Sequence, residues 1–169
     1  MGTRAGAFML APDVPVERHP LLRERYAHHY HRHQDDISLF PGALDLLRRL
    51  KACGHRLAVA TGKSRVGLDR VLRAEELQGM FDASRTADET AGKPHPRMLH
   101  ELMRQFGVAP RRLLMVGDTT HDLQMALNAG CPSVGVSYGA HAHGSFAALH
   151  PRHIAHSVEE LGAWLRDFG

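Results

Sequence analysis

The stretch LLMVGDTTHD, residues 113–122, predicts a buried strand that passes directly into a helix. It opens with a short apolar run, which is long enough for a strand and too short for a helix. Gly117 ends this run, and the pattern from residue 119 to residue 128 is helical. We therefore expect Asp118 at the carboxyl end of a strand and Asp122 in the first turn of the next helix. The apolar residues expected on the buried face of that helix are Leu123, Ala126 and Leu127.

Two carboxylates in this position suit a metal ion. Ligands of open α/β sheets bind in the crevice beyond the carboxyl ends of the strands. Mg²⁺ takes one or two protein carboxylates and keeps several waters, which Asp118 and Asp122 could satisfy. The alternative is structural: Asp118 and Thr119 cap the helix, and Asp122 interacts with its positive N-terminal dipole. The stretch alone leaves both interpretations open.

Length and composition indicate a soluble globular chain of one domain with at most a small appendage. The chain has 169 residues, of which 43% are hydrophobic and 23% charged. No apolar run approaches the roughly 18 residues that span a membrane, and the apolar part of the N-terminus is too short for a secretory signal. Cys53 and Cys131 have no metal-type spacing and are typical of reduced thiols. We expect a cytoplasmic protein with no membrane partner.

The formal charge of +3 does not by itself indicate nucleic-acid binding. The arginines are scattered over several predicted helices and lack the interleaved aromatic residues of a stacking surface, so no nucleic-acid partner is expected. Histidine is unusually frequent, with 14 residues, several of them in the cluster His28–His33. His29 and His33 would share a helix face and could chelate a transition metal, or they simply form the polar face of a surface helix.

Predicted strands alternate with predicted helices along most of the chain. We expect strands at residues 56–60, 81–85, 113–116 and 133–136 and near Ile154, and helices at 21–33, 41–52, 65–74, 97–106, 119–128 and 158–168. This alternation predicts an α/β fold with a parallel sheet and right-handed crossovers.

Two further strand ends carry candidate binding residues. Thr61 and Gly62 follow a strand at the start of a helix, where a hydroxyl and free backbone N–H groups can hold a phosphate. Lys93 lies between Gly92 and Pro94 in a stiff loop, where a cation can stabilise a phosphate or an acidic intermediate. The alternatives are a simple helix cap at Thr61 and a solvated Lys93.

The order and spacing of three motifs resemble those of the haloacid dehalogenase-like (HAD) hydrolases, in particular the phosphoglycolate-phosphatase-like branch. The motifs are ATGKS at residues 60–64, GKPHP at 92–96 and GDTTHD at 117–122. The resemblance runs from about Leu39 to the C-terminus and implies a three-layer, Rossmann-like core with a parallel sheet. It divides the chain into an N-terminal segment with a remnant cap helix, residues 1–38, and a HAD-like core, residues 39–169.

The resemblance also implies roles for these residues. Thr61 and the amides around Gly62 would hold the phosphate, and Lys93 would steady phosphate and nucleophile. Asp118 would bind Mg²⁺ directly, and Asp122 would act through water or by orienting Lys93. The implied reaction is phosphoryl transfer from a small phosphorylated metabolite, such as phosphoglycolate, to an aspartate, followed by hydrolysis.

The sequence departs from the family at the nucleophile. The family carries an Asp-x-Asp-x-Thr motif at the end of its first strand, and these 169 residues contain none. We therefore expect this chain to be inactive or nearly so, either as a shortened form of a competent enzyme or as a non-catalytic form that binds phosphate, a cation or a partner.

The first strand of the family lies between the strands that end at Thr61 and Asp118. We expect residues 5–10 to fill that place, because an empty place would leave backbone groups unpaired. The oligomeric state stays open, although an incompletely covered apolar face would favour a homodimer.

Overall fold

The computed structural model describes residues 39–139 and 146–168. The expected strand at residues 5–10, the helix at 21–33 with the His28–His33 cluster and the cap remnant lie outside this part. The described elements are, in order, α3 (Ala43–Ala52), β1 (Ala58–Thr61), α4 (Arg65–Leu72), η3 (Glu75–Leu77), β2 (Ala83–Thr86), α5 (Arg97–Phe106), η4 (Pro110–Arg112), β3 (Met115–Gly117), α6 (Thr120–Ala129), β4 (Ser133–Val136), η6 (Ala147–Leu149), β5 (His153–Ala155) and α7 (Val158–Phe168).

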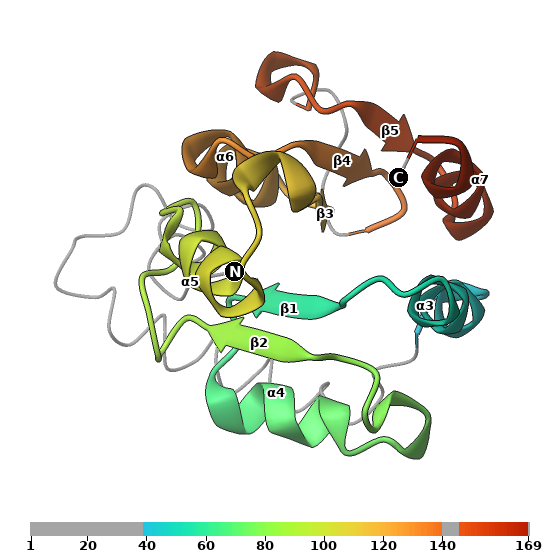
Figure 1. Cartoon of the computed structure of the whole chain (residues 1–169), viewed down its shortest axis with the longest axis horizontal. Helices are drawn as coiled ribbons and strands as arrows, with labels where there is room; N and C mark the ends of the chain where they lie inside the picture. Colours follow the sequence, from blue (N-terminus) through green and yellow to red (C-terminus); the bar gives the residue numbers. More distant parts are fainter. Residues whose placement is uncertain (1–38, 140–145, 169) are drawn as a thin grey trace, which may run out of the picture.

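All strand pairs among the described residues are parallel, which confirms the predicted α/β class. The strands nevertheless fall into two sheets, one with the order β1-β2 and one with the order β3-β4-β5 (Figure 1). Thr61 pairs with Thr86 at the end of the first sheet, and Gly117 pairs with Gly135 in the second. In the described part of the chain, no strand joins β1 to β3.

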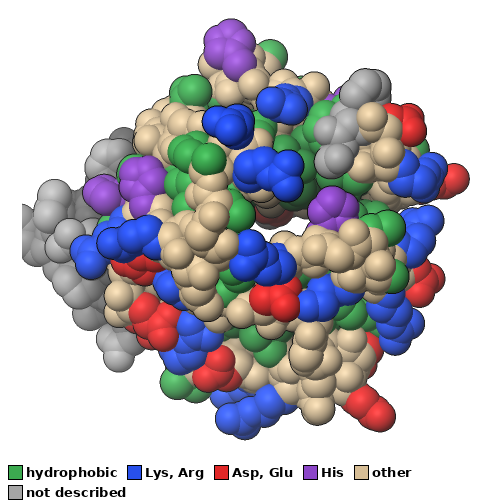
Figure 2. All heavy atoms as spheres, in the orientation of Figure 1, with side chains coloured by type: hydrophobic (Ala, Val, Ile, Leu, Met, Phe, Trp, Pro, Cys, Tyr) green, Lys and Arg blue, Asp and Glu red, His purple; other side chains and the backbone are tan. Residues whose placement is uncertain are grey.

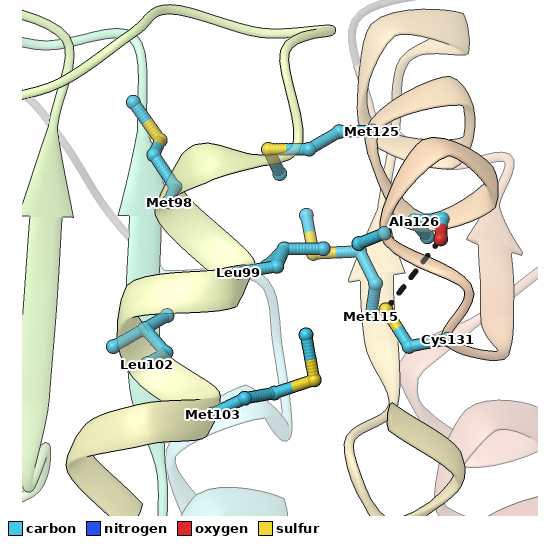
Figure 3. Close-up of a cluster of buried hydrophobic side chains, with 9 residues drawn as sticks. Met98, Leu99, Leu102, Met103, Met115, Met125, Ala126 and Cys131 are labelled. Carbon is cyan, nitrogen blue, oxygen red and sulfur yellow. Dashed lines mark hydrogen bonds between the residues drawn. The ribbon is translucent and has the colours of Figure 1, made fainter. Parts of the chain in front are cut away.

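Helix α5 holds the two sheets together on one face. Its buried residues pack against β3 and α6 and also against small side chains of β1 and β2. Figure 3 shows Leu99 and Met103 of α5 pointing toward Met115 and Cys131, whereas Leu102 points to the other side of the helix, over β1. The buried residues of this cluster are Met98, Leu99, Leu102, Met103, Met115, Met125, Ala126, Ala129 and Cys131.

A second core lies on the opposite face under α3 and α7. Leu46 of α3 and Leu161 of α7 pack there with Val134, Val136 and Ala155 of the second sheet. The strands are therefore covered by helices on both faces, as the predicted three-layer architecture requires. None of the helices in the described ranges is long and apolar enough to cross a bilayer.

Most predicted element bounds agree with the structure to within two or three residues. The strand at 133–136 and the helices at 97–106 and 158–168 are confirmed as predicted. The prediction that Leu127 is buried is wrong, because its side chain is 51% exposed. The buried face of α6 includes Asp122, Met125, Ala126 and Ala129, and this stripe turns Leu127 toward solvent.

Candidate active site

The turn after β1 places Thr61 at the edge of the sheet. Thr61 is the last residue of β1, and its Oγ1 accepts a hydrogen bond of 3.1 Å from the backbone N–H of Lys63. Ser64 caps α4 and accepts from the N–H of Gly67 at 3.2 Å. Because Ser64 is the cap, Thr61 is not needed to start the helix. Gly62 lies in the turn between them.

Asp118 follows β3 directly, and Thr119 caps the next helix. The backbone N–H and the hydroxyl of Thr119 donate to Oδ2 of Asp122 at 3.1 and 2.8 Å. The N–H of Asp122 donates back to Oγ1 of Thr119 at 3.2 Å. The structural interpretation is therefore correct for Thr119 and Asp122, whereas Asp118 takes no part in this capping box.

Lys93 reaches this helix start from the loop after β2. Its Nζ forms an ion pair with Oδ1 of Asp122, and the two side chains are only 16% and 4% exposed. The amide of Asn128 donates to the carbonyl of Pro94 at 3.0 Å, which fixes the loop against α6. The side chain of Lys93 is thus largely buried and is fixed by its ion pair with Asp122. Since both oxygens of Asp122 already have protein partners, the geometry favours an orienting role for Asp122.

An acidic network fixes the loop that leads to Lys93. Arg65 pairs with both carboxylate oxygens of Glu89 at 2.8 and 2.5 Å, and its backbone N–H donates to Asp88 at 3.0 Å. The hydroxyl of the fully buried Thr86 donates toward the same two carboxylates. The Arg65 guanidinium lowers the pKa of Glu89 to about 2. This network ties the start of α4, beside Thr61, to the loop after β2.

Two glycines fit closely against the two aspartates. A Cβ on Gly117 would lie 2.3 Å from Cβ of Asp122, and a Cβ on Gly139 would lie 2.2 Å from Cβ of Asp118. A side chain at position 117 would displace the side chain of Asp122, and one at position 139 would displace that of Asp118. In the sequence, Gly117 marks only the end of a strand, and no pattern singles out Gly139.

Tyr138 also interacts with Asp118, and no sequence pattern predicts this interaction. Burial and the negative charge of Asp118 raise the pKa of its hydroxyl. The ring of Phe40 meets the ring of Tyr138 edge-on, with the ring centroids 5.1 Å apart. Both residues are aromatic and far apart in sequence, so periodicity offers no signal for this contact.

Asp118 is the carboxylate that could hold a divalent cation at the end of β3. No group of three or more acidic, histidine or cysteine side chains arranged to hold a metal occurs among the residues that the structure describes. Mg²⁺ does not need such a group, because it takes few protein carboxylates and fills its octahedron with water and substrate oxygens. A single carboxylate such as that of Asp118 is compatible with that coordination.

The fold is that of a Rossmann-like α/β domain, a class in which ligands bind beyond the carboxyl ends of the strands. The model of the haloacid dehalogenase-like hydrolases matches residues 9–136, which is more than half of the chain. The chain therefore belongs to the haloacid dehalogenase-like hydrolases, and its relatives place it in the phosphoglycolate-phosphatase-like branch.

Two curated relatives and one solved structure illustrate the relationship. The chain is 40% identical over 124 residues to the probable phosphatase IndB of Dickeya dadantii, covering 73% of this chain and 54% of that protein. It is 34% identical over 142 residues to the phosphoglycolate phosphatase of Mannheimia succiniciproducens, covering 83% and 63%. A hydrolase from Pseudomonas syringae has the same fold, with a TM-score of 0.85 at 23% identity over 100% of this chain and 79% of that one. The chain thus spans between half and two thirds of the curated relatives it matches.

Proposed function

We propose that the edge formed by Thr61, Gly62, Lys93 and Asp118 binds the phosphate group of a small phosphorylated metabolite together with Mg²⁺. The observation that carries this proposal is the buried ion pair between Lys93 and Asp122, the residue four positions after Asp118. A lysine that is fixed by a buried carboxylate keeps its cation at one place, which suits an anionic ligand. The relatives named as phosphoglycolate phosphatases support small phosphorylated acids as the substrate class.

Each residue then has a distinct task at that edge. Thr61 offers its hydroxyl proton, and the amides of the following turn offer N–H donors at a helix start. Lys93 neutralises phosphate charge, Asp122 orients Lys93, and Asp118 is the carboxylate that would hold the cation. When bound, Mg²⁺ withdraws charge from the phosphate oxygens and thereby eases attack at phosphorus.

The same proposal predicts binding without turnover for the 169-residue chain. The sequence contains no Asp-x-Asp-x-Thr motif, so the aspartate that would accept the phosphoryl group is not supplied by that motif. The chain then acts as a phosphate- and cation-binding core. We also propose that the protein is cytoplasmic. The predicted homodimer can be tested by analytical ultracentrifugation.

Thermal unfolding with Mg²⁺ and orthophosphate tests the binding edge. A ligand at about 100 times its Kd stabilises the folded state by ~2.7 kcal/mol, which raises Tm by ~5–10 °C for a chain of this length. We expect this rise for the wild type and for Asp45→Asn, whose side chain is 77% exposed on α3. Asp118→Asn should lose it, and an equal rise in Asp118→Asn would refute the proposed edge.

Phosphate release from phosphoglycolate and from an aryl phosphate tests the predicted lack of turnover. The purified chain is assayed with and without Mg²⁺, beside Asp118→Asn. We expect no release above background from the folded protein. Mg²⁺-dependent release that disappears in Asp118→Asn would show that another residue serves as nucleophile.

A further inference from the structure

The side chain of Arg65 joins the start of α4 to β2 and to the loop that follows β2. Its Nε and Nη2 donate to the two carboxylate oxygens of Glu89 at 2.8 and 2.5 Å, which makes a bidentate pair. Its Nη1 donates to Oγ of Ser84 on β2 at 2.9 Å and to Oδ1 of Asp69 on α4 at 3.3 Å. A planar guanidinium that is held from several directions has one orientation. Figure 2 shows acidic and basic side chains gathered where β2 ends and α4 begins.

Backbone groups join the same two segments. The N–H of Arg65 donates to both carboxylate oxygens of Asp88 at 3.0 and 3.1 Å. The N–H of Ala87 donates to the carbonyl of Lys63 at 3.2 Å. The N–H of Lys63 in turn donates to Oγ1 of Thr61 at 3.1 Å. The turn between β1 and α4, which carries the proposed phosphate ligands, is therefore attached to the loop after β2 by both its backbone and its side chains.

The other end of that loop carries Lys93. The ion pair of Lys93 with Asp122 attaches this end to the start of α6. In the middle of the loop, the hydroxyl of Thr90 donates to Oε1 of Glu101 on α5 at 3.1 Å. A loop that is fixed at its start, its middle and its end transmits a displacement of one end to the other. It thus sets the spacing between the β1–α4 turn and the ammonium group of Lys93.

We propose that Arg65 and Glu89 are positioning residues, which hold the β1–α4 turn and Lys93 at the spacing that a bound phosphate group requires. Neither side chain is assigned a contact with phosphate, and the pair acts through the turn and the loop that it joins. Hydrogen bonds to an anion weaken steeply with distance and misalignment, so a small change in this spacing weakens phosphate binding. The cation is assigned to Asp118 on the other sheet and does not depend on the pair. This inference rests on the proposed function.

Calorimetric titration of the full chain with orthophosphate and, separately, with Mg²⁺ tests the pair. Glu89→Gln should leave the chain folded, because the Glu89 side chain is 41% exposed. The variant removes a negative charge, which by itself would favour an anion, so any loss of phosphate affinity reports geometry. We expect the Kd for phosphate to rise about tenfold and the Kd for Mg²⁺ to change less than about twofold. Wild-type phosphate affinity in Glu89→Gln would overturn the proposal.

Arg65→Lys separates orientation from charge. Lysine keeps the positive charge but cannot form the bidentate pair or reach several partners in fixed directions. We therefore expect Arg65→Lys to weaken phosphate binding in the same direction as Glu89→Gln. If Arg65→Lys binds phosphate as the wild type does, the charge alone suffices and the positioning role is wrong.

Asp82→Asn is the matched control at the opposite end of the same two strands. Asp82 accepts hydrogen bonds from Nζ of Lys51 and from the N–H of Leu57, both at 2.7 Å, and thus joins the beginnings of β1 and β2. Its side chain is 31% exposed, so the variant loses an ion pair of similar kind. Both Kd values should stay within about twofold of the wild type. If Asp82→Asn and Glu89→Gln weaken phosphate binding equally, the effect is one of general stability and the proposal fails.

Amide hydrogen exchange without ligand separates this inference from the proposed function. The amides of Lys63, Arg65 and Gly67 should exchange at least tenfold faster in Glu89→Gln than in the wild type, and Asp82→Asn should match the wild type. If this difference appears but the wild type does not bind phosphate, the proposed function alone fails and the pair still positions the turn. Unchanged exchange in Glu89→Gln would overturn the positioning role, whatever the phosphate affinity.

Discussion

Replacing Lys93 by methionine should destabilise the protein strongly, even without any ligand. The change removes the cation from Asp122, whose side chain is only 4% exposed. Removing one partner of a buried ion pair costs about 3–5 kcal/mol. We expect the lower end, about 3 kcal/mol, because Thr119 still donates two hydrogen bonds to Oδ2 of Asp122. For a chain of this length that corresponds to a fall in Tm of ~6–12 °C.

Urea unfolding followed by circular dichroism measures this cost, with Lys51→Met as the matched control. Lys51 pairs with Asp82 at 2.7 Å, but both side chains are about one third exposed, so its loss should cost less than about 1 kcal/mol. The double variant Lys93→Met, Asp122→Asn should recover part of the lost stability, because the unpaired buried charge is gone. If Lys93→Met costs no more than Lys51→Met, the pair does not hold the loop against α6 and the reasoning fails.

Three further predictions concern single residues. Gly139→Ala places a Cβ 2.2 Å from Cβ of Asp118, which must then move, so the Tm rise with Mg²⁺ and phosphate should fall by at least half, whereas Gly92→Ala, with nothing within 4 Å, should keep it. The lowered pKa of Glu89, about 2 against 4.5, means that its contribution is complete above pH 4.5 and is lost as the pH falls toward 2. The urea midpoint of Glu89→Gln should therefore change less than that of the wild type between pH 5 and pH 2.5, and parallel curves would contradict this. Burial raises the pKa of the Cys131 thiol to about 11, so a thiol reagent at pH 8 should label the exposed Cys53 first and Cys131 only on unfolding.

Local pattern in the sequence predicted the elements and the carboxylate edge. The apolar run before Gly117 and the capping sequence after it suffice to place Asp118 beyond β3 and Asp122 in the first turn of α6, because both follow from neighbouring residues. The same holds for Lys93, which two prolines fix in a loop. The ion pair between Lys93 and Asp122 is a contact across 29 residues and entered only through the family resemblance.

Long-range packing could not be predicted from these patterns. Gly139 and Tyr138 lie beside Asp118 only because the chain returns after β4, and no local spacing records that return. Apolar periodicity mispredicts Leu127, because the buried face of α6 includes the charged residue Asp122 and leaves Leu127 exposed. Arg56, Arg111, Arg112 and Arg152 are scattered in the sequence and nevertheless line one cavity, which no local pattern predicts.

The core that joins the two sheets under α5 is rich in sulfur, and this affects how the sheets are held. Met98, Met103, Met115 and Met125 are all buried there, next to Cys131. Methionine is unbranched and has several rotatable bonds, so such a core can repack around small changes in the spacing of the sheets without opening voids. The same thioethers are targets of oxidation, and a sulfoxide would place a polar oxygen in this core. An oxidant that reached them would loosen the attachment of one sheet to the other while leaving the carboxylates and the lysine chemically intact.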